Sequence, residues 1–224
     1  MKKKFWLTMT SSLAYLVLTL VCLVDWRSSE HWRHVDFFSG LYLGMRVLGA
    51  IYSTVVSRGA FRSEELMREW WGLSSDPKTI QRVVILMLAD LVVFFDYGHW
   101  HTLPALERPV LQGVGLTLYA AASAWQAWTD AYLARHFAGD HARRGPMDHG
   151  PFRYVRHPRY AAAILAKSAF ALVFASALGW LLALAWAALL LKKVSVEEDH
   201  LRNMFGNEYE TYARRTARLL PGVY

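Results

Sequence analysis

The stretch that decides the fold is Tyr160–Leu191, YAAAILAKSAFALVFASALGWLLALAWAALLL, in which Lys167 is the only charged side chain. As one straight helix it would be about 48 Å long, well beyond the ~30 Å of a bilayer's hydrocarbon core. Cationic segments lie on both sides of it, and both favour the cytoplasmic face. We therefore predict a helical hairpin that turns back near Ser176–Trp180, with Gly179 at the bend.

Polar motifs flank this hairpin. Before it stands Gly150-Pro151-Phe152-Arg153-Tyr154-Val155-Arg156-His157-Pro158-Arg159-Tyr160, and after it come Glu197-Glu198 and Phe205-Gly206-Asn207-Glu208-Tyr209. Because a hairpin returns the chain to its starting side, the motifs should meet at one end. The following tail should leave the bilayer as one helix, with Leu201, Phe205, Tyr209 and Tyr212 on a single stripe.

The rest of the chain has the composition of a membrane protein, with 54% hydrophobic and 19% charged residues. Four further stretches approach the ~20 residues that a spanning helix needs. They are Phe5–Val24, Phe37–Val56, Ile80–Tyr97 and Val110–Leu133. The predicted fold is all-α: a polytopic transmembrane helix bundle of four spans plus the C-terminal hairpin. We expect one integral membrane domain over residues 1–224, with the four spans in 1–133 and the motif loop, hairpin and cytoplasmic tail in 134–224.

The net charge of +7 is distributed unevenly along the chain. If the N-terminus is cytoplasmic, nearly all cations outside the spans fall on the cytoplasmic side, and the opposite loops hold only Arg27, Arg33 and Arg108. We therefore expect both termini in the cytoplasm and a bacterial inner-membrane location. Basic stripes interleaved with aromatic residues are absent outside the membrane, so nucleic acid is not an expected partner.

The motif loop concentrates hydrogen-bond donors. The two prolines bend the backbone, so that Arg156, His157 and Tyr160 can converge on a carboxylate or phosphate. Glu197 and Glu198 add acceptors that suit a ribose diol or an ammonium group. The competing interpretation is that the arginines bind anionic lipid headgroups and the glutamates neutralise them.

The order of these motifs resembles the isoprenylcysteine carboxyl methyltransferases and the related phospholipid methyltransferases. The resemblance covers Asp148 to Pro221 and includes the hairpin, Glu-Glu and Phe-Gly-x-x-Tyr-x-x-Tyr. It implies an integral membrane enzyme that uses S-adenosylmethionine at the cytoplasmic face and admits a lipophilic small-molecule or lipid acceptor from the bilayer. The sequence leaves open whether oxygen, nitrogen or sulfur is methylated, and the oligomeric state.

The resemblance also assigns roles to residues. It implies that His157 and Tyr160 hold the donor's amino-carboxylate end and that Glu198 approaches the adenosine. The remaining candidates for cofactor binding are Gly150, Tyr154, Pro158 and Glu197. The candidate catalytic residues are Arg156, Lys193 and Lys167. Lys193 departs from the arginine that the family often has there, and Arg159 is expected to point toward the lipid interface.

Polar residues inside the spans are costly and need a reason to be there. We expect Arg46 to pair with Asp90. Lys167 lies about 10 Å deeper than Tyr160 on the same helix, where it either faces the acceptor path or extends to the headgroups. Gln126, Trp128 and Asp130, at the end of the fourth span, could line the same cavity.

Other classes of site find less support. Asp96, His99 and His101 lie on the side away from the motifs, so an interfacial turn is expected there and no metal site. The Gly-x-Gly-x-x-Gly motif of dinucleotide-binding folds is absent from the sequence. Two alternatives stay open: a membrane reductase that uses NADPH on a lipid enone, and a non-catalytic lipid-binding protein.

Overall fold

The computed structural model describes residues 17–23, 36–60, 85, 88–137 and 146–220. These residues are helical apart from the connecting turns and one isolated β-bridge between Val155 and Ala217. The predicted all-helical class is therefore confirmed over the described part of the chain. The helices are α2 (Phe37–Ala60), α5 (Pro109–Phe137), α6 (Pro158–Val173), α7 (Ala177–Phe205) and α8 (Asn207–Arg215), together with residues 17–23 and 88–95.

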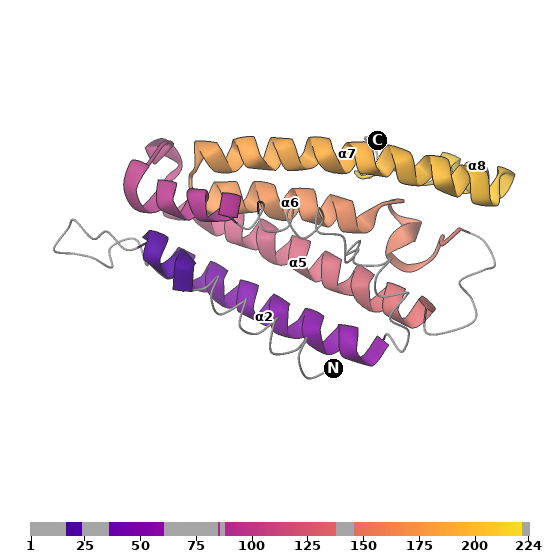
Figure 1. Ribbon diagram of the computed structural model, residues 1–224, viewed down its shortest axis with the longest axis horizontal. Coiled ribbons are helices and arrows are strands. Elements are labelled where there is room, and N and C mark those ends of the chain that lie inside the picture. The colour runs from indigo at the N-terminus through magenta and orange to yellow at the C-terminus, as the bar shows by residue number, and fades with distance from the viewer. Residues whose placement is uncertain (1–16, 24–35, 61–84, 86–87, 138–145, 221–224) are drawn as a thin grey trace.

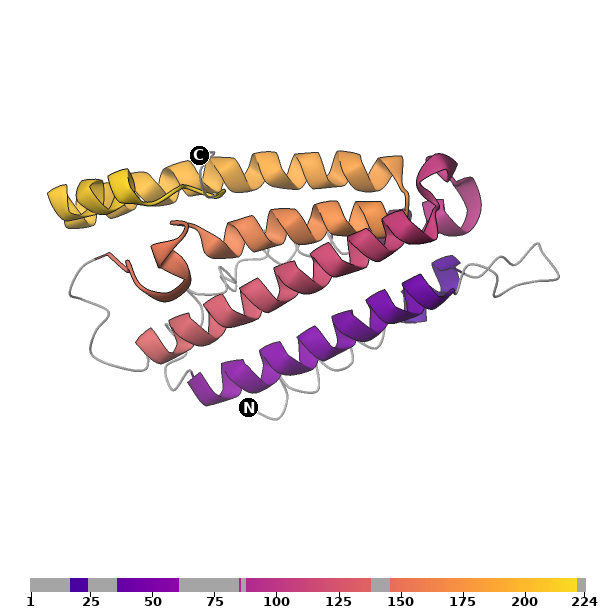
Figure 2. The ribbon, with the colours of Figure 1, turned by 180° about the vertical axis from the view of Figure 1, so that it is seen from behind.

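The four longest elements lie side by side along the molecule. Figures 1 and 2 show α6 between α7 and α5, with α2 on the far side of α5. The short α8 lies at the end of α7 that is farthest from the hairpin turn. Helix α6 packs against both α5 and α7, which makes it the centre of the layer that carries the motif loop.

An aromatic cluster holds the bundle together near the hairpin turn. The ring of Tyr42, on α2, lies 4.7 Å from Tyr119 and 5.2 Å from both Phe170 and Phe174, measured between ring centres. Phe94 packs edge-on against Phe174 at 4.8 Å. Rings in such tilted or edge-to-face pairs attract each other beyond the gain from burial alone. The cluster therefore anchors α2, the 88–95 helix and α5 to the hairpin.

The predicted hairpin is present, although its bend lies elsewhere than expected. Helix α6 ends at Val173, Ala175 adopts a left-handed φ of 43°, and Ser176 Oγ caps α7 by accepting from Gly179 N over 3.0 Å. Gly179 therefore lies in the first turn of α7. A Cβ there would come within 3.1 Å of Ala171 Cα, so the glycine is needed for close packing of α6 and α7.

Asp96 organises the loop that packs beneath this bend. Its carboxylate is fully buried and accepts hydrogen bonds from Thr102 N at 3.2 Å, from Thr102 Oγ1 at 2.7 Å, and from the Ser176 hydroxyl. The turn expected around Asp96 is thus a hydrogen-bonded loop that fixes the hairpin to the end of the 88–95 helix.

The two arms of the hairpin differ in length, because α7 continues well past Leu191 to Phe205. The single helical stripe predicted for the tail is wrong, since Gly206 separates α7 from α8 and turns the chain. Tyr209 and Tyr212, on α8, are nevertheless buried.

Among the described helices, α7 alone combines the length and the apolar composition needed to cross a membrane. The predicted first span lies mostly outside the described residues, as does the beginning of the third. The four-span arrangement therefore stays a prediction.

One ion pair between residues of the predicted spans differs from the prediction. Asp90 forms its ion pair with Lys167 of α6 in place of the expected Arg46. The Lys167 ammonium also lies 5.6 Å from the centre of the Phe170 ring. Asp90 precedes Phe94 by one helical turn, and the 88–95 helix packs on α6, so the carboxylate faces Lys167 directly.

Candidate functional site

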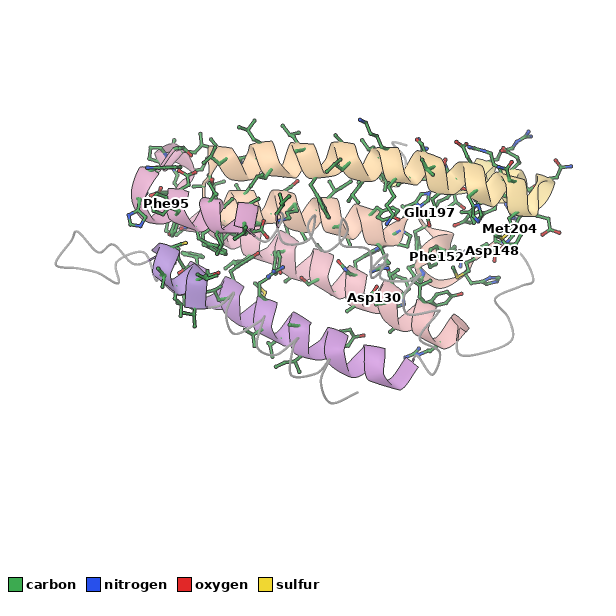
Figure 3. The ribbon with its side chains drawn as sticks, in the orientation of Figure 1. Phe95, Asp130, Asp148, Phe152, Glu197 and Met204 are labelled. Atoms are coloured by element: carbon green, nitrogen blue, oxygen red, sulfur yellow. The ribbon has the colours of Figure 1, made fainter. Side chains whose placement is uncertain are left out.

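A cavity of ≈ 760 Å³ lies at the end of the bundle opposite the loop around Asp96. It is bordered by the C-terminal part of α5, the motif loop, the start of α6 and one face of α7, and it is open to the outside. Figure 3 shows Glu197, Phe152 and Asp130 gathered near this end, with Phe95 at the other. The lining residues are Gln126, Leu133, Met147, Phe152, Arg156, His157, Pro158, Arg159, Tyr160, Ala163, Trp186, Leu190, Lys193, Val196, Glu197 and His200.

The face of α7 that borders the cavity changes character along its length. Trp186, Leu190, Lys193, Glu197 and His200 follow one another at spacings of three or four residues, which places them on one side of the helix. The first two are apolar in their bulk and the last three are ionisable. The cavity therefore has an apolar inner end, which also includes Ala163, and a polar outer end.

The backbone path of the motif loop depends on Gly150. This residue has a φ of +60°, and a Cβ would lie 2.5 Å from the Tyr132 ring. A short 3-10 turn, Gly150–Arg153, follows and brings Phe152 to the cavity wall. Pro158 then opens α6, where a missing amide hydrogen costs nothing. Together these constraints fix His157 at the N-terminal boundary of α6.

His157 and Tyr160 form the part of the wall that the sequence singled out. Their rings are stacked with centres 5.6 Å apart and planes inclined by 20°. The Tyr160 hydroxyl donates to Glu197 Oε2 over 2.8 Å, and the Lys193 ammonium lies 5.6 Å from the Tyr160 ring centre. A carboxylate, an ammonium and two ring faces are thus held within one short stretch of the cavity.

Glu198 sits behind this wall as the centre of a charge network. Its side chain is 2% exposed, and Oε1 lies 2.9 Å from Arg156 Nε and 3.3 Å from His157 Nε2. Oε2 lies 3.1 Å from Arg218 Nη2 and 3.6 Å from Arg202 Nη2. Burial holds the pKa of His157 below its ordinary value, although Glu197 and Glu198 act in the opposite direction. We therefore treat His157 as a neutral imidazole.

The structure sorts the predicted site residues into two groups. Those that line the cavity are Arg156, His157, Pro158, Tyr160, Lys193 and Glu197. Those that lie elsewhere are Gly150, Tyr154, Lys167 and Glu198. The roles of both groups in binding or catalysis stay predictions.

Each residue of the second group has a physical reason for its place. Gly150 lets the loop pass close to the Tyr132 ring, and the carboxylate oxygens of Glu198 form ion pairs with arginines. Tyr154 is 52% exposed and packs beside Trp125 and Trp128, with ring centres 6.3 Å away in each case. Lys167 is bound to Asp90 one helical turn beyond Ala163.

Arg159 also differs from its prediction, but it lies closer to the cavity than expected. It was expected to face lipid, yet it lines the cavity and its Nε lies 3.1 Å from Asp130 Oδ1. Gln126 reaches the cavity as expected, and Asp130 is connected to it through Arg159. Trp128 is not a lining residue.

Sequence reasoning missed Met147, Trp186 and His200. The last two could have been found by extending the Lys193 and Glu197 positions along α7 at helical spacing. Met147 precedes the motif loop in a segment with no periodicity, so no sequence signal indicated it.

The arrangement suits a ligand with both charged and aromatic parts. The outer end offers a carboxylate, an ammonium and imidazoles, while Phe152, Tyr160 and Trp186 offer ring faces that attract cations. Trp186 Nε1 is buried without a hydrogen-bond partner in the described part of the chain. The apolar inner end leaves room for a second, less polar molecule next to the first.

Comparison with known proteins gives a consistent result. Residues 109–208, which include α5, the motif loop, the hairpin and both glutamates, match the phospholipid methyltransferase family. Methanethiol S-methyltransferase of Mycobacterium tuberculosis is 26% identical over 215 residues, covering 87% of this chain and 84% of that protein. Methanethiol S-methyltransferase 2 of Bradyrhizobium diazoefficiens is 29% identical over 196 residues, covering 79% and 71%.

Proposed function

We propose that the chain, which matches the phospholipid methyltransferase family over residues 109–208, is a membrane methyltransferase whose cavity binds S-adenosylmethionine and methylates a small apolar thiol. The observation that carries this proposal is the graded cavity, which is ionisable at its outer end and apolar at its inner end. A zwitterionic donor and an apolar acceptor can lie in line there.

The outer end has groups that complement the donor. Lys193 would pair with its carboxylate and Glu197 with its ammonium or ribose, each through charge-assisted hydrogen bonds. The faces of Tyr160 and Phe152 would stabilise the sulfonium by roughly 0.5–2 kcal/mol. S-adenosylmethionine supplies an already activated methyl group, so the protein has mainly to align the acceptor and exclude water.

A thiol is the acceptor that we place first. The relatives carry the name methanethiol S-methyltransferase, and a molecule of that kind matches the small apolar end formed by Ala163, Trp186 and Leu190. In the transfer, a thiolate attacks the methyl carbon as the methyl–sulfonium bond breaks. Two neutral thioethers result, and the thiol proton goes to water.

The cavity mouth would face the cytoplasm of a bacterial inner membrane, with both chain termini on that side. The distribution of cations supports this orientation. Labelling of single cysteines in a Cys22→Ser background tests it: positions 148 and 215 should react from the cytoplasmic side and position 107 from the outside. Reaction of position 215 from the outside would exclude the arrangement.

The proposed activity is tested with the purified protein in two steps. Calorimetry with S-adenosylhomocysteine should give binding, whereas NADPH should give none. Incubation with radiolabelled S-adenosylmethionine should then transfer label to methanethiol or ethanethiol, and the volatile product should resist base. Base-labile label in the lipid fraction would instead indicate a carboxylate acceptor. Binding of NADPH alone would favour the reductase.

A further inference from the structure

The C-terminal segment that follows α8 runs directly alongside the motif loop. Val155 and Ala217 form a parallel bridge. The Arg156 amide donates to the Ala217 carbonyl over 2.8 Å, and the His157 amide donates to the Arg218 carbonyl over 3.2 Å. Two consecutive amides of the loop therefore bond to the tail, so the backbone that presents His157 to the cavity depends on a segment distant in sequence.

Side chains reinforce this backbone pairing. Arg156 Nη1 donates to the Ala213 carbonyl over 2.7 Å and also to the Thr216 carbonyl. The buried Tyr212 hydroxyl donates to the Phe152 carbonyl over 2.8 Å. Arg156 and Phe152 both line the cavity, so α8 and the residues after it hold the cavity wall from behind.

Glu198 joins the tail to α7 and to the loop. Its two oxygens are shared between Arg156 and His157 on one side and Arg218 on the other. Arg218 Nη2 also donates to Ser195 Oγ over 3.0 Å. A carboxylate buried this deeply needs its cationic partners, because an uncompensated buried charge is strongly destabilising. Loss of the Arg218 charge would leave Glu198 with Arg156 and the longer 3.6 Å contact from Arg202, and would therefore shift the carboxylate that Arg156 and His157 both contact.

From these contacts we infer that the segment Thr216–Leu219 is a working part of the methyl-donor site, with Arg218 and Glu198 as positioning residues for Arg156 and His157. The inference rests on the proposed function, in which the cavity binds S-adenosylmethionine. Because coupling between two sites is reciprocal, donor binding should tighten the pairing of tail and loop, and that pairing should in turn strengthen donor binding. Neither Arg218 nor Glu198 lines the cavity.

The experiment compares Arg218→Gln with Arg214→Gln, which removes the same charge from an exposed position in the same part of the chain. Calorimetry with S-adenosylhomocysteine should show about 5- to 20-fold weaker binding for Arg218→Gln, less than for loss of a direct charge-assisted contact, because Arg218 acts through Arg156 and His157. Arg214→Gln should stay within about twofold, by the same measure. Arg218→Lys keeps the charge and should recover part of the affinity. At saturating donor, kcat should be unchanged while the KM for the donor rises.

Amide hydrogen exchange of the full-length parent protein provides a test that needs no variant. S-adenosylhomocysteine should slow exchange at the amides of Arg156 and His157, whose acceptors are tail carbonyls, and Arg218→Gln should speed it. Equal affinity of Arg218→Gln and the parent would overturn the inference. So would exchange at these amides that does not respond to the ligand. If the parent itself binds no S-adenosylhomocysteine, the proposed function fails first, and the inference falls with it.

Discussion

The hydroxyl of Tyr160, on α6, donates a 2.8 Å hydrogen bond to the carboxylate of Glu197, on α7. This bond crosses from one arm of the hairpin to the other at the polar end of the cavity. It holds the Tyr160 ring against His157 and within reach of the Lys193 ammonium. One hydroxyl thus sets the relative positions of Tyr160, Glu197 and Lys193, which we propose to contact the methyl donor.

Removing that hydroxyl should weaken donor binding. Loss of a hydrogen bond to a charged group typically costs roughly 1.5–3 kcal/mol, or about 10- to 150-fold in affinity. We expect Tyr160→Phe to weaken S-adenosylhomocysteine binding on that scale in calorimetry. Tyr154→Phe is the matched control, because Tyr154 lies outside the cavity and should leave the affinity unchanged. Equal affinities of Tyr160→Phe and the parent would remove Tyr160 from the site.

The fold was largely predictable where a length or charge constraint existed. The hairpin followed from a stretch too long for one span and from cations at both of its ends. The position of the bend did not, since Ala175 adopts a left-handed conformation that sequence preference would assign to the nearby Gly179. The break at Gly206 was missed because the aromatic spacing continued across it.

From the sequence one could predict which motifs meet at the site. The direction of each side chain was harder to predict. His157, Tyr160 and Glu197 reach the cavity as expected. Glu198 was expected at the ligand, but the sequence could not show that Arg218, distant along the chain, would approach it. Loop residues such as Tyr154 have no helical periodicity, so nothing in the sequence indicated its outward direction.

Stability should fall on the acid side because of His157. Burial lowers the pKa of its imidazole from the ordinary 6.5, so the folded protein binds fewer protons there than the unfolded chain. Stability then rises with pH through this window and is lost as pH falls below about 6.5. Thermal melts of the parent in detergent between pH 7.5 and pH 5.5 should therefore shift downward. His157→Asn should flatten this dependence, and an unchanged slope would mean that other groups cause it.

Ala163 should set the size of the acceptor. It lies one helical turn beyond Tyr160, at the apolar inner end of the cavity that Trp186 and Leu190 also line. Ala163→Leu fills part of that end, and differences of one methylene in such pockets are worth about 1–3 kcal/mol. We expect kcat/KM for hexanethiol to fall at least about 10-fold relative to methanethiol, with donor affinity nearly unchanged.

The control for this prediction is Ala161→Leu. Ala161 is two residues away on α6, hence on the opposite face, and it does not line the cavity. It should leave the selectivity between the two thiols as in the parent. If Ala163→Leu instead weakens S-adenosylhomocysteine binding as strongly as it impairs turnover, the donor occupies the inner end and the proposed orientation is reversed.

The last prediction tests whether Lys167 has a structural or a catalytic role. Its ammonium pairs with Asp90 inside the bundle, and the two side chains are 22% and 12% exposed. Lys167→Met leaves the Asp90 carboxylate without this cation, and breaking one half of a buried pair costs about 3–5 kcal/mol, less where water or headgroups reach it. Replacing both members is often neutral, so Asp90→Leu with Lys167→Met should melt close to the parent in detergent. Because Lys167 lies outside the cavity, the double variant should also keep its methyl-transfer rate when assayed below its melting temperature. A double variant that is as stable as the parent yet inactive would return Lys167 to the acceptor path, where the sequence first suggested it.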